Sequence, residues 1–292
     1  MTENVKEISL GEYQRCFEPP TVFDSAAFIR LNAHKVSSVA VVSGHGLALP
    51  IGYDADSGLW RAPFSAPFAM PAGGGDYAAF AHDLLSFCEG RVQLVTPPPF
   101  HAGVPEWIDV LDNEALTRVA NYSYHYPLER LDSMKSYMST NMRRNYNSAM
   151  RQGFSLRLTN DVDAVYNFIA DHHKQLGYHM AMTLQQVRDT TQVADIDFFE
   201  CVLGGQVVGA AFFYHVAPGV TQLINWGDAL NMRDKHITAF LLYSIFEHYR
   251  SRGILIVDLG PASVDGIKNE GLVRFKLSAG CIETVKPTFI GG

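Results

Sequence analysis

The stretch DFFECVLGGQVVGAAFFYHVAPGVTQLINWGDA, residues 197–229, contains three apolar segments separated by two short turns that contain glycine. The segments 197–203, 206–216 and 221–229 are rich in β-branched and aromatic residues, which is typical of strands. The turns LGGQ (203–206) and APGV (217–220) are short, and a tight turn joins strands that run antiparallel next to each other. The stretch therefore predicts a three-stranded meander.

A helix and a further strand are expected after the meander. In ITAFLLYSIFEHYRSRG (237–253) the apolar residues recur with the period of a helix that lies on a sheet, and Gly253 suits its end. ILIVDL (254–259) is short, apolar and β-branched, so it predicts a buried strand. The segment RDKH (233–236) lies at the predicted start of the helix.

The first half of the chain has a similar order of segments. AGGG (72–75) leads into YAAFAHDLLSFCEG (77–90) and then RVQLVTPPP (91–99), while SSVAVVS (37–43) and LALPIGY (47–53) predict two earlier strands. The loop 61–75 is too rich in proline and glycine for regular structure. We interpret this order as a duplicated unit, with residues 1–128 as a degenerate first copy and 129–292 as the second copy.

Composition excludes several classes of protein. The 292 residues are 47% hydrophobic and 18% charged, which predicts well-filled cores rather than disorder. The net charge of −7 argues against general nucleic-acid binding. No window reaches the ~20 apolar residues of a membrane span and the amino terminus has no secretion signal, so a cytoplasmic protein without membrane insertion is expected. The four scattered cysteines are expected to be reduced and mostly buried.

Four stretches resemble one known fold. They are APFSAPFAMPAGG (62–74), MRRNYNSAMRQGF (142–154), LLYSIFEHYRSRGILIVDLGP (241–261) and EGLVRFKLSAGC (270–281). Together they resemble the GNAT-type N-acyltransferases in their tandem form, as in the Fem peptidyltransferases and the BioF2-like or CelD-like acetyltransferase-domain proteins. The last stretch resembles the family signature G-L-x-x-F-K-x-x-x-G, with Gly271, Leu272, Phe275, Lys276 and Gly280 in register. The resemblance implies an α+β fold of two GNAT-like units, each a mixed, mostly antiparallel sheet flanked by helices.

The sequence departs from this family at two places. DLGP (258–261) stands where the family often has Asp-Phe-Gly-Gly, which changes the turn after the strand. His236 and Thr238 stand where enzymes that bind acetyl-CoA have the glycines of their pyrophosphate loop. A helix N-terminus keeps its free N–H groups and partial positive charge whatever its side chains are, so we interpret 233–242 as an altered donor site.

The resemblance implies roles for several residues. Lys276 is expected to neutralise a donor phosphate or the charge that develops on the acyl oxygen. Glu200 is the first candidate for the base, with Asp228 and His215 as competitors. Gly227 either marks a β-bulge that opens the sheet or packs under Trp226.

The other candidate site residues fall into two groups. The donor (cofactor) site is expected to contain Asn225, Trp226, Gly227, Arg233, His236, Ile237, Thr238 and Ala239. A substrate-binding site is expected to contain Arg144, Arg151 and Phe275. Arg144 and Arg151 share one helix face, and the alternative is that this face is simply solvated. His172 and His173 are adjacent and are expected to point apart, so no metal is expected.

The function implied is transfer of an acyl or aminoacyl group from an activated donor to an amine acceptor. Acyl-CoA and aminoacyl-tRNA both remain open as donors, and the acidic net charge disfavours tRNA. The alternative is a non-catalytic binding protein that holds a ligand or partner in an interdomain groove. The acceptor and the oligomeric state are left open by the sequence.

Overall fold

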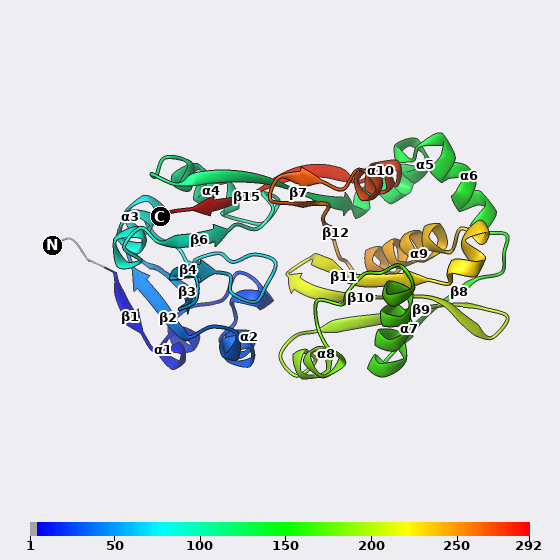
Figure 1. Ribbon diagram of the computed structural model, residues 1–292. Helices are drawn as coiled ribbons and strands as arrows, with labels where there is room; N and C mark the ends of the chain where they lie inside the picture. The colour runs from blue at the N-terminus through cyan, green and yellow to red at the C-terminus, as the bar shows by residue number, and fades with distance from the viewer. Residues whose placement is uncertain (1–4) are drawn as a thin grey trace. The chain divides into compact units, whose positions relative to one another are not determined.

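A computed structural model describes residues 5–292 and shows two compact units (Figure 1). Unit 1 consists of residues 5–123, Ser263–Lys268 and Thr284–Gly292, and unit 2 of Tyr124–Ala262 and Asn269–Glu283. Each unit has its own helices and its own run of strands, and each is described by itself.

Unit 2 is built around a sheet with strand order β8-β9-β10-β11-β12. Its strands are β8 (Ser155–Thr159), β9 (Ile196–Leu203), β10 (Gln206–Ala217), β11 (Val220–Asp228) and β12 (Ile256–Pro261). Its helices are α5 (Met134–Tyr137), α6 (Thr140–Ala149), α7 (Val162–Gln175), α8 (Leu184–Thr190), α9 (Ile237–Ser251) and α10 (Glu270–Ser278).

The predicted meander is confirmed as β9, β10 and β11, which pair antiparallel in chain order. Gly204 and Gly205 have φ values of 57° and 82°, which is the left-handed pair that a two-residue hairpin needs. Pro218 and Gly219 form the next turn, where Gly219 again has a positive φ of 73°. The sequence therefore fixes both turns by residues that tolerate this conformation.

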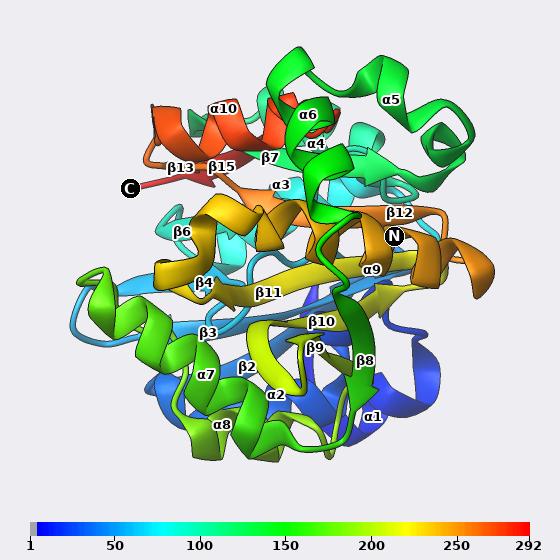
Figure 2. The same cartoon turned by 90° about the vertical axis from the view of Figure 1, so that its right-hand side faces the viewer.

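Helices cover both faces of the unit 2 sheet, and β10 is almost entirely buried between them (Figure 2). On one face α7 packs against β10 and β11, and on the other face α9 packs against the same strands. Two glycines allow this close approach. A Cβ added at Gly227 would lie 3.0 Å from Cβ of His172 on α7, and one added at Gly209 would lie 2.8 Å from Cγ2 of Ile237 on α9.

Helix caps fix where these helices begin. The Asp161 side chain accepts from the Ala164 N–H at the start of α7, and Thr183 and Gln186 form a reciprocal capping box at α8. Asn269 caps α10 by accepting from the Leu272 N–H. These caps place α7 and α10, which carry residues of the cavity described below.

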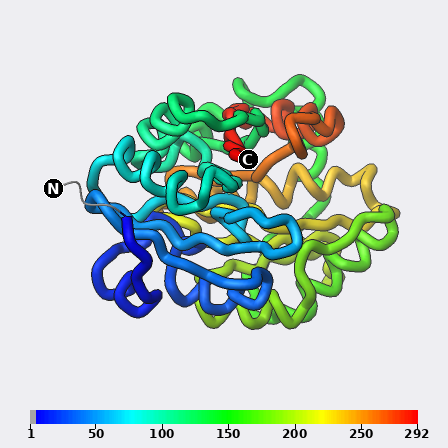
Figure 3. The backbone as a smooth tube through the Cα atoms, turned by 60° about the vertical axis from the view of Figure 1, so that its left-hand side comes forward, coloured from blue at the N-terminus to red at the C-terminus, as the bar shows by residue number. Residues whose placement is uncertain are grey.

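Unit 1 has the strand order β1-β2-β3-β4-β6-β15, with the short β5 paired to β3. Figure 3 shows its blue antiparallel strands β2 and β3 side by side. The strands are β1 (Lys6–Ile8), β2 (Ser38–Gly44), β3 (Leu47–Asp54), β4 (Leu59–Ala62), β5 (Ala72–Gly73), β6 (Val92–Val95), part of β7 (Thr117–Pro127), the hairpin β13 (Ser263–Val264) and β14 (Ile267–Lys268), and part of β15 (Ile282–Ile290). The helices are α1 (Leu10–Cys16), α2 (Ala26–Asn32), α3 (Tyr77–Phe87) and α4 (Val104–Asp112).

The same order of elements occurs twice along the chain. Strand, two helices, a three-stranded meander, a helix and a strand follow each other from β1 to β6 and again from β8 to β12. The two predicted helices are equivalent: α3 joins β4 to its parallel neighbour β6, and α9 joins β11 to its parallel neighbour β12. The chain is an α+β protein whose strands are mixed and mostly antiparallel and are flanked by helices, which confirms the predicted fold class.

Candidate functional site

The parallel strands β11 and β12 part at a defined point in unit 2. Their pairing begins at Val220 and Ile256 and ends at Gln222 and Asp258, although both strands continue. The Gln222 amide donates to Asp258 Oδ2 at 2.9 Å, and Asp258 Oδ1 accepts from the Gly260 N–H at 2.8 Å. Beyond this point the edge of β11 that faces β12 has no strand partner among the described residues 5–292.

A β-bulge lies just past the parting point, and it is not at Gly227. Phe212 pairs with Asn225 and Phe213 with Leu223, so Ile224 is the extra residue of β11. Gly227 pairs regularly with Ala210 and makes room for α7 instead. The expectation that Gly227 marks the bulge is therefore wrong in position. Sequence cannot distinguish these cases, because a strand glycine serves a bulge or a close approach equally well.

A cavity of about 1200 Å³ occupies the gap, and all of its lining residues belong to unit 2. Its walls come from β11, the end of β12, the start of α9, one face each of α6 and α7, and α10. Trp226 and Phe275 form part of the wall, with ring centroids 5.2 Å apart in an edge-to-face arrangement. Of the predicted residues, those that line the cavity are Asn225, Trp226, Gly227, Asp228, Arg233, His236, Thr238, Ala239, Phe275 and Lys276.

The start of α9 forms one end of this cavity. His236 adopts φ 58° and ψ 42°, the left-handed conformation that usually calls for glycine. His236 thus adopts the left-handed backbone conformation that a glycine would adopt in a glycine-rich loop. Among residues 5–292 no protein group accepts from the N–H of Ile237 or Thr238, so both N–H groups remain available at the helix N-terminus. The Ile237 side chain is buried under the helix and does not line the cavity.

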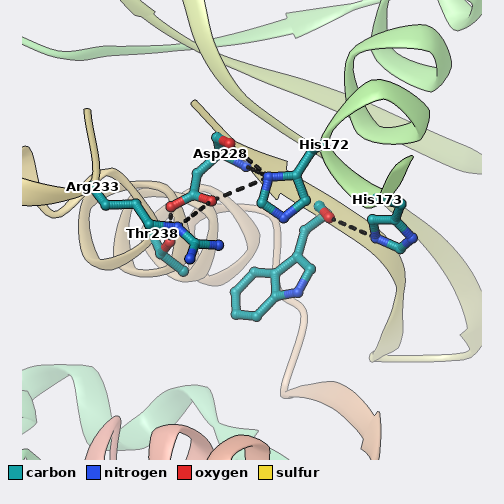
Figure 4. Close-up of polar contacts among 6 residues, drawn as sticks. His172, His173, Asp228, Arg233 and Thr238 are labelled. Carbon is teal, nitrogen blue, oxygen red and sulfur yellow. Dashed lines mark hydrogen bonds and ion pairs between the residues drawn. The ribbon is translucent and has the colours of Figure 1, made fainter. Parts of the chain in front are cut away.

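Asp228 lies beside the same helix start (Figure 4). Its Oδ2 accepts from Thr238 Oγ1 at 3.2 Å, and its Oδ1 lies 3.6 Å from Arg233 Nε and 3.4 Å from His172 Nδ1. The carboxylate therefore already complements part of the positive end of α9. A glycine-rich phosphate-binding loop has no carboxylate of its own at the helix N-terminus. The Asp228 carboxylate therefore distinguishes this site from such a loop.

Lys276 lines the cavity but is a buried cation. Its side chain is 2% exposed, and Nζ donates to the carbonyls of Leu259, Gly260 and Pro261 at 2.8, 2.8 and 3.0 Å. Burial lowers the pKa of Lys276 to about 8, and the Asp258 carboxylate opposes this shift. All three ammonium protons have acceptors, so Lys276 holds the parted end of β12 in place.

The other candidates lie outside the cavity. Glu200 is buried on β9, where its carboxylate is bonded to Arg157 (Nε to Oε2, 2.7 Å). His215 pairs with Asp197 at 2.8 Å and also lies outside the lining. Arg144 and Arg151 belong to exposed positions of α6 and the turn after it, and neither lines the cavity. We therefore remove Glu200, His215, Arg144 and Arg151 from the site.

Two histidines that sequence reasoning set aside do line the cavity. The rings of His172 and His173 have centroids 5.8 Å apart, and both contact β11. His173 Nε2 lies 3.3 Å from the Trp226 carbonyl, and burial lowers its pKa. The expectation that they point apart is wrong, because adjacent residues on a helix differ by about 100°, so both can face one strand. Among residues 5–292 no three His, Cys, Asp or Glu side chains gather as a metal site requires.

Comparison with known proteins identifies the fold. FemX aligns with a TM-score of 0.67 over 98% of this chain and 96% of its own, at 8% identity. The C-terminal domain of a putative lysylphosphatidylglycerol synthetase from Agrobacterium fabrum aligns with a TM-score of 0.63 over 97% of this chain and 92% of its own, at 12% identity. This is a Fem/GNAT-like acyltransferase fold.

The tandem arrangement is found in a further solved structure. A tandem GNAT protein from the clavulanic acid biosynthesis pathway aligns with a TM-score of 0.52 over 99% of this chain and 98% of its own, at 11% identity. No family model matches the sequence, and no curated protein matches it. At these identities the likeness concerns the fold, so the chemistry has to be argued from the residues of the cavity. No helix among residues 5–292 is both long and apolar enough to span a membrane.

Proposed function

We propose that this chain transfers an acyl or aminoacyl group from an activated donor to an amine, and that the cavity of unit 2 holds the reacting groups. The observation that carries the proposal is the parting of β11 and β12 directly beside the N-terminus of α9. The degenerate character of the repeat in residues 1–128 is part of the same proposal.

The parted strands support binding of the acyl end of a donor. Past Gln222, β11 stays paired with β10, but its other edge has no strand partner among residues 5–292, and the bulge at Ile224 lies in this part of the strand. Unpaired N–H groups on a strand edge are suitable donors both for an extended ligand and for the oxygen of an acyl carbonyl. The Trp226 and Phe275 rings supply an apolar wall that limits water at that position.

The charges of the cavity support a donor that carries phosphate. The cations in its lining are Arg233, Arg274 and Lys276, whereas Asp228 is the one carboxylate. This local excess of positive charge contrasts with the net charge of −7 of the whole chain. The N–H groups of Ile237 and Thr238 have no acceptor among residues 5–292. They also support a phosphate-bearing donor, because a helix N-terminus favours anions.

Donor identity is an open part of this proposal. The Asp228 carboxylate, 3.2 Å from Thr238 Oγ1, repels a second negative group at the start of α9. A donor that places one phosphate there is therefore favoured over one that places a pyrophosphate there. Both acyl-CoA and aminoacyl-tRNA carry phosphates at several distances from the acyl group, so the two donors have to be compared directly.

One observation favours the non-catalytic alternative. Every proton of the Lys276 ammonium already has a carbonyl acceptor, so Lys276 has none left for the oxygen of a reacting acyl group. Its charge still acts on the cavity, but only through space. A protein that binds the donor and does not turn it over is the corresponding second candidate.

The proposal is tested by supplying labelled donors. Purified protein is incubated separately with labelled acetyl-CoA and with labelled aminoacyl-tRNA, each with a set of amines including hydroxylamine as a small trapping amine. We expect one donor class to be consumed faster than its uncatalysed rate, with label appearing in an amide. Calorimetric binding without turnover would support the second candidate, and neither binding nor turnover would contradict both.

A further inference from the structure

His172 is placed like a proton acceptor in this cavity, and the evidence begins with its ring nitrogens. Nδ1 lies 2.6 Å from the Asp228 carbonyl oxygen and 3.4 Å from Asp228 Oδ1. The Asp228 N–H lies 3.2 Å from the same Nδ1, but one nitrogen cannot both donate and accept. The shorter contact decides, because two acceptors 2.6 Å apart would repel each other. Nδ1 therefore carries the proton and donates to Asp228.

The other nitrogen is consequently the basic one. With the proton on Nδ1, Nε2 of the neutral ring has a free lone pair. Among residues 5–292 Nε2 has no hydrogen-bond partner, and it is not among the polar atoms sealed in the interior. The ring as a whole is held tightly, since the side chain is only 10% exposed. Figure 4 shows the second ring nitrogen of His172 pointing away from Asp228.

His173 provides a contrast on the same helix. Its Nε2 lies 3.3 Å from the Trp226 carbonyl, and its Nδ1 is buried. Neither nitrogen is therefore free to take a proton from a ligand. Of the two neighbouring rings in this wall, only His172 presents an accessible lone pair.

We infer that His172 Nε2 is the general base for the attacking amine and that Asp228 is its positioning residue, an inference that rests on the proposed function. As the amine nitrogen forms a bond to the acyl carbon, its proton passes to Nε2 and the C–S or C–O bond of the donor breaks. The imidazolium then returns that proton to the leaving thiolate or alkoxide. The Asp228 carboxylate, 3.4 Å from Nδ1, offsets the charge of the imidazolium while it exists.

The test compares three variants under single-turnover conditions with the active donor and hydroxylamine, which is mostly neutral near pH 7. His172→Gln is expected to lower the transfer rate by about 10²- to 10⁴-fold. His173→Gln is expected to lose less of the rate than His172→Gln. Asp228→Asn retains the carbonyl that orients Nδ1, so its loss of rate is expected to be smaller than that of His172→Gln.

Donor affinity and rescue by added imidazole provide two further tests of the role of His172. Donor affinity is measured by calorimetry on each variant, and His172→Gln is expected to leave it within about threefold, because the ring acts on the acceptor. Added imidazole is expected to restore part of the rate of His172→Ala. A transfer rate of His172→Gln equal to that of the parent would overturn the inference alone, whereas absence of transfer by the parent with every donor would overturn the proposed function and this inference with it.

Discussion

The Gln222 amide donates a 2.9 Å hydrogen bond to Asp258, and these two residues are also the last pair in register between β11 and β12. Both side chains are buried, at 3% and 1% exposure. Asp258 Oδ1 also accepts from the Gly260 N–H, so one carboxylate both closes the paired part of the strands and holds the backbone of the parted part. The geometry of the cavity therefore depends on a polar contact in the core.

Removing this contact should destabilise unit 2. Asp258→Ala leaves the Gln222 amide and the Gly260 N–H without their acceptor, and we expect the free energy of unfolding to fall by about 2 to 4 kcal/mol. Urea denaturation followed by circular dichroism measures the change. Glu247→Ala, an exposed carboxylate on α9, is the matched control and should change stability by less than about 0.5 kcal/mol. Equal stability of the two variants would show that the contact is dispensable.

Lys276 should make stability depend on pH in a specific window. Its pKa is lowered from 10.5 to about 8 in the folded protein, so between these values the unfolded chain binds the proton more tightly. The free energy of unfolding of the parent should therefore rise with pH, relative to Lys276→Met, by up to about 1.4 kcal/mol per pH unit between pH 8 and 10. Denaturation of both proteins at several pH values measures this difference.

The Lys276→Met variant should also be less stable than the parent at pH 7.5. Lys276→Met removes the donor for three carbonyls at the end of β12, and we expect a loss of about 2 kcal/mol. Lys174→Met changes an exposed lysine of α7 and controls for loss of charge. If the difference in free energy of unfolding between the parent and Lys276→Met does not change from pH 8 to 10, the lowered pKa of the buried Lys276 is contradicted.

His236 should be a site where glycine stabilises. The residue has a φ of 58° and precedes the first helical residue of α9, so glycine there relieves backbone strain and does not interrupt the helix. We expect His236→Gly to raise the free energy of unfolding by up to about 1 kcal/mol. Thermal unfolding measures this, and His179→Gly in an exposed loop provides the comparison. A clear loss of stability in His236→Gly would mean that the imidazole contributes more than the strain costs.

Arg233 should contribute to donor binding in a salt-dependent way. Its side chain is 52% exposed and shares Asp228 with Thr238, so we expect Arg233→Ala to weaken a phosphate-bearing donor by about fivefold at low salt, which is about 1 kcal/mol. The loss should shrink as salt rises, because screening removes part of the charge interaction in the parent. Calorimetry at 50 and 300 mM salt measures both quantities. Arg151→Ala, outside the cavity, should show no such effect, and equal behaviour of the two would exclude Arg233 from the donor site.

The fold was predictable from the sequence where local chemistry is decisive. The hairpin glycines 204 and 205, the proline and glycine at 218 and 219, and the apolar face of α9 each specify one conformation, so the meander and the crossover helix were predicted correctly. The edge strand β8 was missed, because three of its five residues are polar or charged and it lacks the apolar run by which strands were recognised.

The site was predictable only in part, since its chemistry depends on tertiary contacts. Arg233 and Thr238 were placed in one predicted site because they lie close together in the sequence at one helix start, and the structure brings Asp228 to both of them. His172 was missed because it lies on another helix, 56 residues before Asp228. The burial of Lys276 was also missed, since three carbonyls from a distant strand end determine it. Neither contact leaves a local pattern in the sequence.

The central claim is that acyl transfer takes place in the cavity beside the parted strands, and blocking that cavity tests it most directly. Asn225 lines the cavity on β11, so Asn225→Trp is expected to fill space needed by the donor, while Asn160→Trp adds the same ring at an exposed position outside it. We expect transfer of labelled acyl groups by the parent and by Asn160→Trp, and at least about a hundredfold slower transfer by Asn225→Trp with its circular dichroism spectrum preserved. Transfer by Asn225→Trp at the rate of the parent would place the reaction elsewhere and contradict the account.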